Sequence, residues 1–311
     1  MPFGFSRCPR RNSISGSLAV KAPGFFTTVQ DLGRFGYAHL GISASGAADA
    51  VALRIGNRLV GNHENAAALE MTLLGGAFEF EARAVVALTG SEFGASLPLW
   101  TATRMDAGQV LRCGPARSGA RCYLCVRGGI EAPLVFGSAS THALTGIGGI
   151  DGRPLKAGDV LRIGDHAVSP PLTRRLEPAP REPEVLRATD GPQAGWFEQG
   201  FYGSEYRVSE ASNRMGLRLH GPRPRQRHGR QLLTEGVSLG AVQAPLEGDP
   251  IILFVEHQTT GGYPKIANVI SADLTAVGQL RPRDRVRFER VSLETAWDLL
   301  RRQEEFIRSI A

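Results

Sequence analysis

The chain has 311 residues and a formal net charge of +6, with 42% hydrophobic and 21% charged residues. This composition excludes a wholly disordered protein, and a prior of about 150 residues per domain predicts two domains. The 38 glycines and 19 prolines place glycine well above its usual share of about 7%. No Gly-X-Y period accompanies them, so they indicate short strands joined by tight turns rather than collagen.

Several classes of protein are excluded by what the sequence lacks. The densest basic run, residues 223–230, contains no aromatic residue, so a nucleic-acid-binding surface is not expected. No stretch approaches the ~18 apolar residues of a membrane helix. No apolar region follows the basic residues Arg10 and Arg11, so a secretory signal is not expected either. We therefore expect a cytoplasmic protein that acts without nucleic acid or a membrane.

The pattern of cysteines indicates buried thiols rather than a disulfide framework or a zinc site. Four cysteines are too few to form a disulfide framework in a chain of this length. Cys122 and Cys125 form a lone CxxC within a segment that is typical of a strand, where their spacing puts them on opposite faces. No second CxxC or paired histidine completes a zinc site.

The first half predicts strands around one helix. Residues 1–17 are expected to be a disordered leader, and the segment that begins at Thr27 and leads up to Ser45 an extended loop. A helix is predicted after Ser45 as N-cap, with an apolar stripe ending at Leu59 and a stop at Gly61-Asn62. Short strands are expected at residues 18–21, 69–74, 77–80, 85–88, 123–126, 135–136 and 155–164.

A Pro-rich linker is expected at residues 169–184, and the sequence after it again predicts short strands. IILFVEHQTTGG (251–262) resembles CYLCVRGG (122–129), and LRPRDRVRFE (280–289) resembles LKAGDVLRIG (155–164). This weak duplication predicts two β-barrel-like domains, residues 18–168 and 185–311, with a few short helices. A final helix is expected from about residue 292 to residue 307.

Three polar segments are candidates for chemistry. In the first, Gln30, Asp31 and Arg34 lead through Ser45 to Asp49, where a helix N-terminus could hold an anion. Asp31 or Asp49 would act as acid or base, although a helix cap and a salt-bridged loop would explain the same residues.

The second segment is Asn213 and Arg214 before Gly216, which suits anion or amide recognition, or simply a turn. The third follows an apolar strand and contains Gln258, Thr259, Thr260 and Tyr263. Backbone N–H groups near its glycines could form an anion-binding nest. The neighbouring His257 is a candidate base, or a strand-end histidine paired with a neighbour.

Familiar catalytic motifs are missing. The sequence contains no GxxxxGK[ST] P-loop, no Met-Lys biotin-attachment pair, no GxSxG elbow and no HExxH metal motif. The chain is therefore expected to bind no ATP through a P-loop, to carry no covalent biotin and to contain no metal site.

Longer motifs resemble a known family over residues 18 to 290. The first half contains PGFFTTVQDLGRFGYAHLGISASGAADAVALRIGNRLVGN, AALEMTLLGG, CYLCVRGGI, GSAST and GRPLKAGDVL. The second half contains SNRMGLRL, LLTEGVSLGAVQAP and HQTTGGYPKIANVISADL. These segments resemble the KipA-like family of 5-oxoprolinase C subunits, which is related to allophanate hydrolase subunit 2 and to the carboxyltransferase domain of urea carboxylase. Ala139 stands where the family often has Arg, and Glu256 where it commonly has Asp.

The resemblance implies two cyclophilin-like β-barrels in a protein that works with two other 5-oxoprolinase subunits, a KipI-like B subunit and an A subunit. That complex would convert 5-oxoproline to glutamate with ATP hydrolysis, ATP being bound in the complex. Two alternatives stay open. One is a carboxyltransferase component that acts on urea or a related amide with a separate biotin carrier. The other is a regulator that binds a KipI-like kinase inhibitor.

Overall fold

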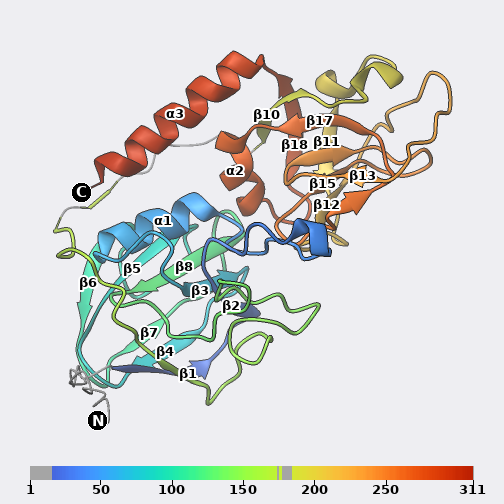
Figure 1. The fold of residues 1–311 in the computed structure, drawn as a ribbon. Coiled ribbons are helices and arrows are strands. Elements are labelled where there is room, and N and C mark those ends of the chain that lie inside the picture. Colours follow the sequence, from blue (N-terminus) through green and yellow to red (C-terminus); the bar gives the residue numbers. More distant parts are fainter. Residues whose placement is uncertain (1–15, 174, 177–183, 311) are drawn as a thin grey trace, which may run out of the picture.

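The computed structural model describes residues 16–173, 175, 176 and 184–310. The predicted leader lies almost wholly outside these residues, as does part of the predicted linker. The architecture is mainly β with few helices, as the sequence predicts (Figure 1).

The first half consists of two antiparallel sheets that face each other across one apolar core. Five strands form one sheet, in the order β2 (Phe26–Gln30), β3 (Ala68–Thr72), β8 (Arg121–Val126), β5 (Ala84–Gly90) and β6 (Ala102–Met105). The other sheet has the order β7 (Val110–Arg112), β4 (Ala77–Phe80), β1 (Ser17–Ala22) and β9 (Val160–Arg162). Leu18, Phe80 and Leu124 are among the residues buried between them.

Strand β8 lies at the centre of the five-stranded sheet, and all six of its residues are buried. Cys122 packs into the core between the sheets, whereas Cys125 packs with helix α1 (Ala50–Leu59) on the opposite face. Both thiols are free, as is that of Cys113. The predicted placement of the two CxxC thiols on opposite faces is therefore confirmed.

Strand β2 corrects the start of the loop expected from Thr27 onward, because residues 26–30 pair in register along β3. Threonine has a high strand propensity because its branched side chain packs well on a pleated surface, so Thr27 and Thr28 suit this position. The short strand expected at residues 135–136 is also wrong, since Val135 and Ser138 instead close a tight turn.

The second half is a closed barrel. Its seven strands follow the order β10 (Val185–Asp190), β17 (Lys265–Val269), β14 (Ala241–Gln243), β15 (Ile251–Leu253), β12 (Gly216–His220), β11 (Glu205–Val208) and β18 (Arg285–Arg290). All pairs are antiparallel except β10 with β18, which closes the barrel. A separate pair, β13 (Glu235–Gly236) and β16 (Thr260–Gly261), joins two loops.

Helix α1 begins four residues later than the sequence predicts. Its N-cap is Asp49, whose carboxylate accepts a hydrogen bond from the Ala52 N–H over 3.0 Å. Ser45, the predicted cap, has a positive φ of 54° and lies in the loop before the helix. Ser45 is therefore a loop residue, and Asp49 caps the helix.

Helices α2 (Leu274–Gln279) and α3 (Leu293–Ser309) connect the halves. Figure 1 shows α3 running from the second barrel back toward α1, and there Arg54 pairs with Glu304 over 2.6 Å. Only the C-terminal end of the predicted apolar face of α3 is buried, at Ile307, whereas Leu293 and Trp297 are exposed. The described residues also form four short 3-10 helices: Ala38–Leu40, Ala194–Trp196, Phe201–Gly203 and Ser271–Asp273.

Candidate functional site

The first predicted segment folds around the carboxylate of Asp31. This buried carboxylate accepts hydrogen bonds from the Gly33 N–H (2.8 Å), the Ala139 N–H (2.7 Å), the Ser138 hydroxyl (2.6 Å) and the Ser140 hydroxyl (2.5 Å). Such a fully occupied carboxylate organises the turn at 138–140. The backbone of Ala139 makes its contact regardless of side chain, so the departure from Arg at this position leaves the turn intact.

Arg34 lies beside this turn with part of its guanidinium unpaired. Nη2 donates to the Ser140 carbonyl and Nε to the Val135 carbonyl (3.4 Å), whereas the buried Nη1 has no partner among the described residues. Burial lowers the pKa of Arg34 from its ordinary value, and the charges of Asp31 and Glu256 oppose that shift. A buried guanidinium with a free donor suits an anionic group.

The amide of Gln30 shares this environment. Its Nε2 donates to Thr28 Oγ1 and to the Thr141 carbonyl, each over 3.0 Å. Its Oε1 is buried without a partner among the described residues. The site therefore holds an unpaired acceptor on Gln30 as well as an unpaired donor on Arg34.

Ser45 joins this site to the second half of the chain. Its N–H donates to the Val255 carbonyl over 2.9 Å, and its hydroxyl contacts both Glu256 Oε1 (3.3 Å) and the Thr141 carbonyl (3.2 Å). In Figure 1 the blue segment between β2 and α1 lies against the second barrel below β12. Residues from both halves thus line one continuous polar seam.

Arg214 and Asp49 hold the two halves together. Arg214 donates to Glu70 Oε1 (2.5 Å), Glu256 Oε1 (2.5 Å) and the Gly46 carbonyl (2.6 Å). Asp49 accepts from Thr275 Oγ1 (2.6 Å) and Gln279 Nε2 (2.8 Å).

Two interpretations of Asp49 were open, a helix cap and a proton-transfer group. These contacts favour the helix cap. Asn213, next to Arg214, uses its Oδ1 to accept from the Met215 N–H over 2.8 Å, so it shapes a turn.

The third segment lies at the end of the same seam. His257 Nδ1 lies 2.6 Å from the Gln258 carbonyl oxygen. Because a carbonyl only accepts, Nδ1 carries the proton and Nε2 keeps its lone pair. Burial lowers the pKa of His257, so the neutral ring is favoured. His257 can therefore accept a proton at Nε2.

Beyond it, Gln258 Nε2 donates to Gln243 Oε1 (3.4 Å), and the Thr259 carbonyl accepts from the Val237 N–H (3.1 Å). Thr260 lies in the short strand β16, and Tyr263 is about half exposed. The segment thus exposes the phenol of Tyr263, and it leads into a polar cluster on the barrel that is formed by Lys265, Glu235, Gln193 and Gln243.

The third predicted segment ends at Lys265, but sequence reasoning missed the other members of that polar cluster. Buried Lys265 pairs with Glu235, which also accepts from Gln193 Nε2 over 3.0 Å. Gln243 is buried with its Nε2 unpaired among the described residues. The signal was the rarity of lysine, since Lys265 is one of three in the chain.

Glu70 was missed too, although a single acid stood among apolar residues in AALEMTLL. It is fully buried, and its Oε2 accepts from the Tyr123 hydroxyl (2.7 Å) and the Ala48 N–H (2.8 Å). An ionised group in that position needs buried partners, which the second half supplies through Arg214.

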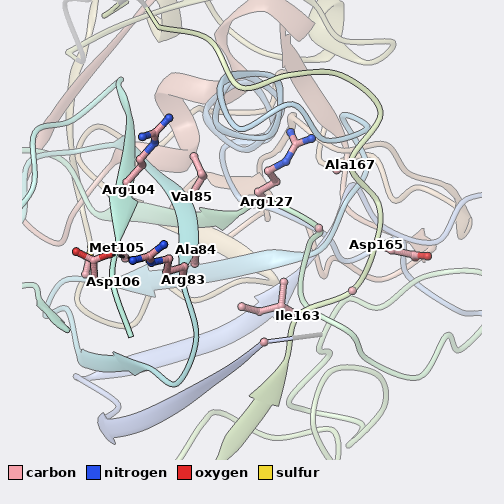
Figure 2. Close-up of a pocket in the computed structure, with 13 residues that line it drawn as sticks. Arg83, Ala84, Val85, Arg104, Met105, Asp106, Arg127, Ile163, Asp165 and Ala167 are labelled. Carbon is pink, nitrogen blue, oxygen red and sulfur yellow. Dashed lines mark ion pairs between the residues drawn. The ribbon is translucent and has the colours of Figure 1, made fainter. Parts of the chain in front are cut away.

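Several pockets lie around the described part of the molecule. One of about 830 Å³ is on the first half and contains none of the predicted residues. Figure 2 shows Arg104 and Arg127 on either side of its Val85, with Arg83 beside Asp106.

Two other pockets lie along the seam between the halves. Asp49 lines one of about 740 Å³ with residues of α1, α2 and α3, and Asn213 and Arg214 line one of about 340 Å³. Within the described part of the chain, no group of three or more His, Cys, Asp or Glu side chains could hold a metal ion. No helix among those residues is long and apolar enough to cross a membrane.

Comparisons with known proteins agree with this architecture. A family model described as carboxyltransferase domain, subdomain A and B, matches residues 40–290. The C subunit of 5-oxoprolinase from Escherichia coli (strain K12) is 41% identical, covering 94% of this chain and 97% of that protein. The protein of the same name from Haemophilus influenzae is 39% identical, covering 91% and 94%.

Solved structures also match. The urea amidolyase of K. lactis superimposes with a TM-score of 0.89 at 30% identity, covering 96% of this chain but only 20% of its own. TTHA0988 superimposes with a TM-score of 0.81 at 36% identity, covering 90% of this chain and 57% of its own. The chain therefore belongs to the carboxyltransferase-domain family that includes the C subunit of 5-oxoprolinase.

Proposed function

We propose that this protein is the C subunit of an ATP-dependent 5-oxoprolinase that hydrolyses 5-oxoproline to glutamate together with the A and B subunits. The observation that carries the proposal is the 41% identity to the C subunit of 5-oxoprolinase over nearly the full length of both chains. The site between the halves supplies groups that suit such a substrate.

Arg34 and Gln30 are the substrate-binding groups in this proposal. The substrate has a carboxylate and a lactam N–H. The unpaired Nη1 of Arg34 can donate to the former, and the unpaired Oε1 of Gln30 can accept from the latter. Ser45 and Glu256 would border the bound lactam, because their contact closes the seam at this point.

Ring opening needs activation because resonance stabilises the lactam. Transfer of the ATP γ-phosphoryl group to the lactam oxygen would release ADP. Attack of water at the ring carbon and cleavage of its C–N bond would open the ring to an acyl phosphate of glutamate, and a second water would hydrolyse this to glutamate and phosphate. ATP would be bound elsewhere in the complex, since this chain has no P-loop. His257 is the proposed acceptor of the proton from water, through its free Nε2.

The test is ATP hydrolysis that depends on 5-oxoproline, measured with the purified A and B subunits in the presence and absence of this chain. We expect turnover only with all three. In the assembled complex, Arg34→Met should raise the KM for 5-oxoproline about 10-fold or more, the loss of one charge-assisted contact. Unchanged turnover without this chain would refute the proposal.

A second function is favoured by the family model and by the likeness to urea amidolyase. A carboxyltransferase component would need bicarbonate and a biotin carrier on another chain. The same assay separates the two functions, because avidin should abolish carboxyl transfer and leave 5-oxoproline hydrolysis unchanged.

A further inference from the structure

Two loops of the first half expose large apolar side chains beside the Arg34 site. Phe35 is 73% exposed and Leu40 59% exposed in the loop between β2 and α1. Leu144 is 70% exposed and Leu134 68% exposed in the connection between β8 and β9, which also exposes Phe136. Exposed apolar residues are ordinary when scattered, but a group of them marks an interaction surface.

The two loops lie against each other and form one surface. The rings of Tyr37 and Phe136 are 4.9 Å apart. Arg34 donates to the carbonyls of Val135 and Ser140 in the opposite loop. We name the surface formed by Phe35, Tyr37, Leu40, Leu134, Phe136 and Leu144 the docking face.

The docking face is almost free of charge. Residues 32–48 contain one charged side chain, Arg34, and residues 132–150 contain none. Arg34 itself is buried. Loops that stay in water are usually rich in charged and polar residues, whereas the centres of permanent protein interfaces are depleted of charge and rich in aromatic residues.

The loops are also held in place before any partner arrives. Asp31 fixes the turn at 138–140 through three hydrogen bonds and its own loop through a fourth, from the Gly33 N–H. Phe136 is held at a φ of 52°, a conformation that non-glycine residues rarely adopt. A preformed surface loses less conformational entropy on binding.

We propose that the docking face binds the B subunit of the same enzyme through an apolar surface, and that this partner closes the Arg34 site. The inference rests on the proposed function, in which this chain is one subunit of an enzyme. A protein occupant is supported by the longer relatives, in which the matching part is joined to further polypeptide. A small ligand would not cover six large side chains on two loops.

Closure would place the partner directly over Arg34 and Gln30. Both carry buried polar atoms without partners among the described residues, and their electrostatic interactions with a substrate strengthen when water is excluded. The docked partner would therefore make substrate binding depend on assembly.

The test measures binding of this full chain to the B subunit by titration calorimetry and size-exclusion chromatography. Phe35→Asp and Leu144→Asp should each weaken binding on the order of 100-fold, as for central interface residues. The matched control is Leu233→Asp, at a leucine that is 90% exposed in the second half, and it should change the affinity less than about 3-fold. Thermal unfolding of each free variant shows that the fold is kept, and Leu134→Asp serves as a replacement for any that unfolds.

Unchanged affinity in folded docking-face variants would overturn the proposal. Concentration-dependent self-association of the free chain that is lost in these variants would also overturn it, because the occupant would then be a second copy. If the wild-type subunits assemble through this face yet show no 5-oxoproline-dependent turnover, the proposed function fails while the docking face stands.

Discussion

Arg214 Nη1 lies 2.5 Å from Glu70 Oε1, although the two residues are 144 positions apart and belong to different halves of the chain. Both side chains are almost completely removed from solvent. Burial lowers the pKa of Arg214, but Glu70 and Glu256 outweigh that cost and the pKa is raised. This ion pair therefore joins the sheets to the barrel from within.

Replacing Arg214 should destabilise the whole chain. Arg214→Met leaves the buried carboxylate of Glu256 without this cation and leaves Glu70 with only Arg121, whose Nε is 3.9 Å away, which costs about 3–5 kcal/mol. Urea denaturation measures the loss. The matched control, Arg283→Met, removes an exposed pair with Glu210 and should cost less than about 1 kcal/mol. Equal, small losses in both variants would contradict the role given to Arg214.

Gly278 is a second point of contact between the halves. A Cβ added there would lie 2.2 Å from the Ala48 carbonyl oxygen, so Gly278→Ala should force α2 away from the segment before α1. We expect a loss on the order of 3 kcal/mol in the free energy of unfolding, measured by urea denaturation. Gly195→Ala, where a Cβ meets nothing within 4 Å, should be nearly neutral. A neutral Gly278→Ala would show that the halves can separate there without cost.

The sequence predicts the elements of this fold better than their assembly. The apolar stripe of α1 and the alternating segment at β18 (Arg285–Arg290) are local patterns, and both elements form. The cap of α1 was misplaced because Ser45 and Asp49 are both good caps locally. Both residues have partners in the distant half of the chain, Ser45 in Glu256 and Asp49 in Thr275, and such contacts cannot be seen in the local sequence.

The candidate site shows the same limit. Gln30, Asp31, Arg34 and Ser45 do meet, because a short loop places them around the turn at 138–140. The partners that decide what each residue does come from distant parts of the chain. Asp31 looked like an acid or base from its neighbours in sequence, yet two serines and two backbone N–H groups occupy its oxygens.

Asp31→Asn tests whether this carboxylate organises the turn. The amide NH₂ cannot accept a hydrogen bond, so at least one donor loses its partner, and we expect a loss of at least about 2 kcal/mol of stability. Faster hydrogen exchange at Ala139 would locate the damage. Asp165→Asn, at an exposed position, is the control. If stability and exchange are unchanged while turnover of the assembled enzyme disappears, Asp31 acts chemically instead.

His257 should make the stability of the protein depend on pH. Burial lowers its pKa, so the unfolded chain binds the proton more readily than the folded one. The stability that comes from the neutral ring is complete above the ordinary pKa of about 6.5, and it is lost as the pH falls from there toward the lowered pKa of the folded state. The contribution of one proton is at most ~1.4 kcal/mol per pH unit.

The measurement compares wild type with His257→Gln by urea denaturation between about pH 5 and pH 8, the range in which histidine titrates. The difference in unfolding free energy between the two proteins should shift in favour of the variant as the pH falls, because glutamine does not titrate. His228→Gln, at an exposed histidine, should leave the pH dependence of the wild type unchanged. Parallel pH profiles for wild type and His257→Gln would mean that the ring is not held neutral, and the assignment of Nε2 as a base would then fail with it.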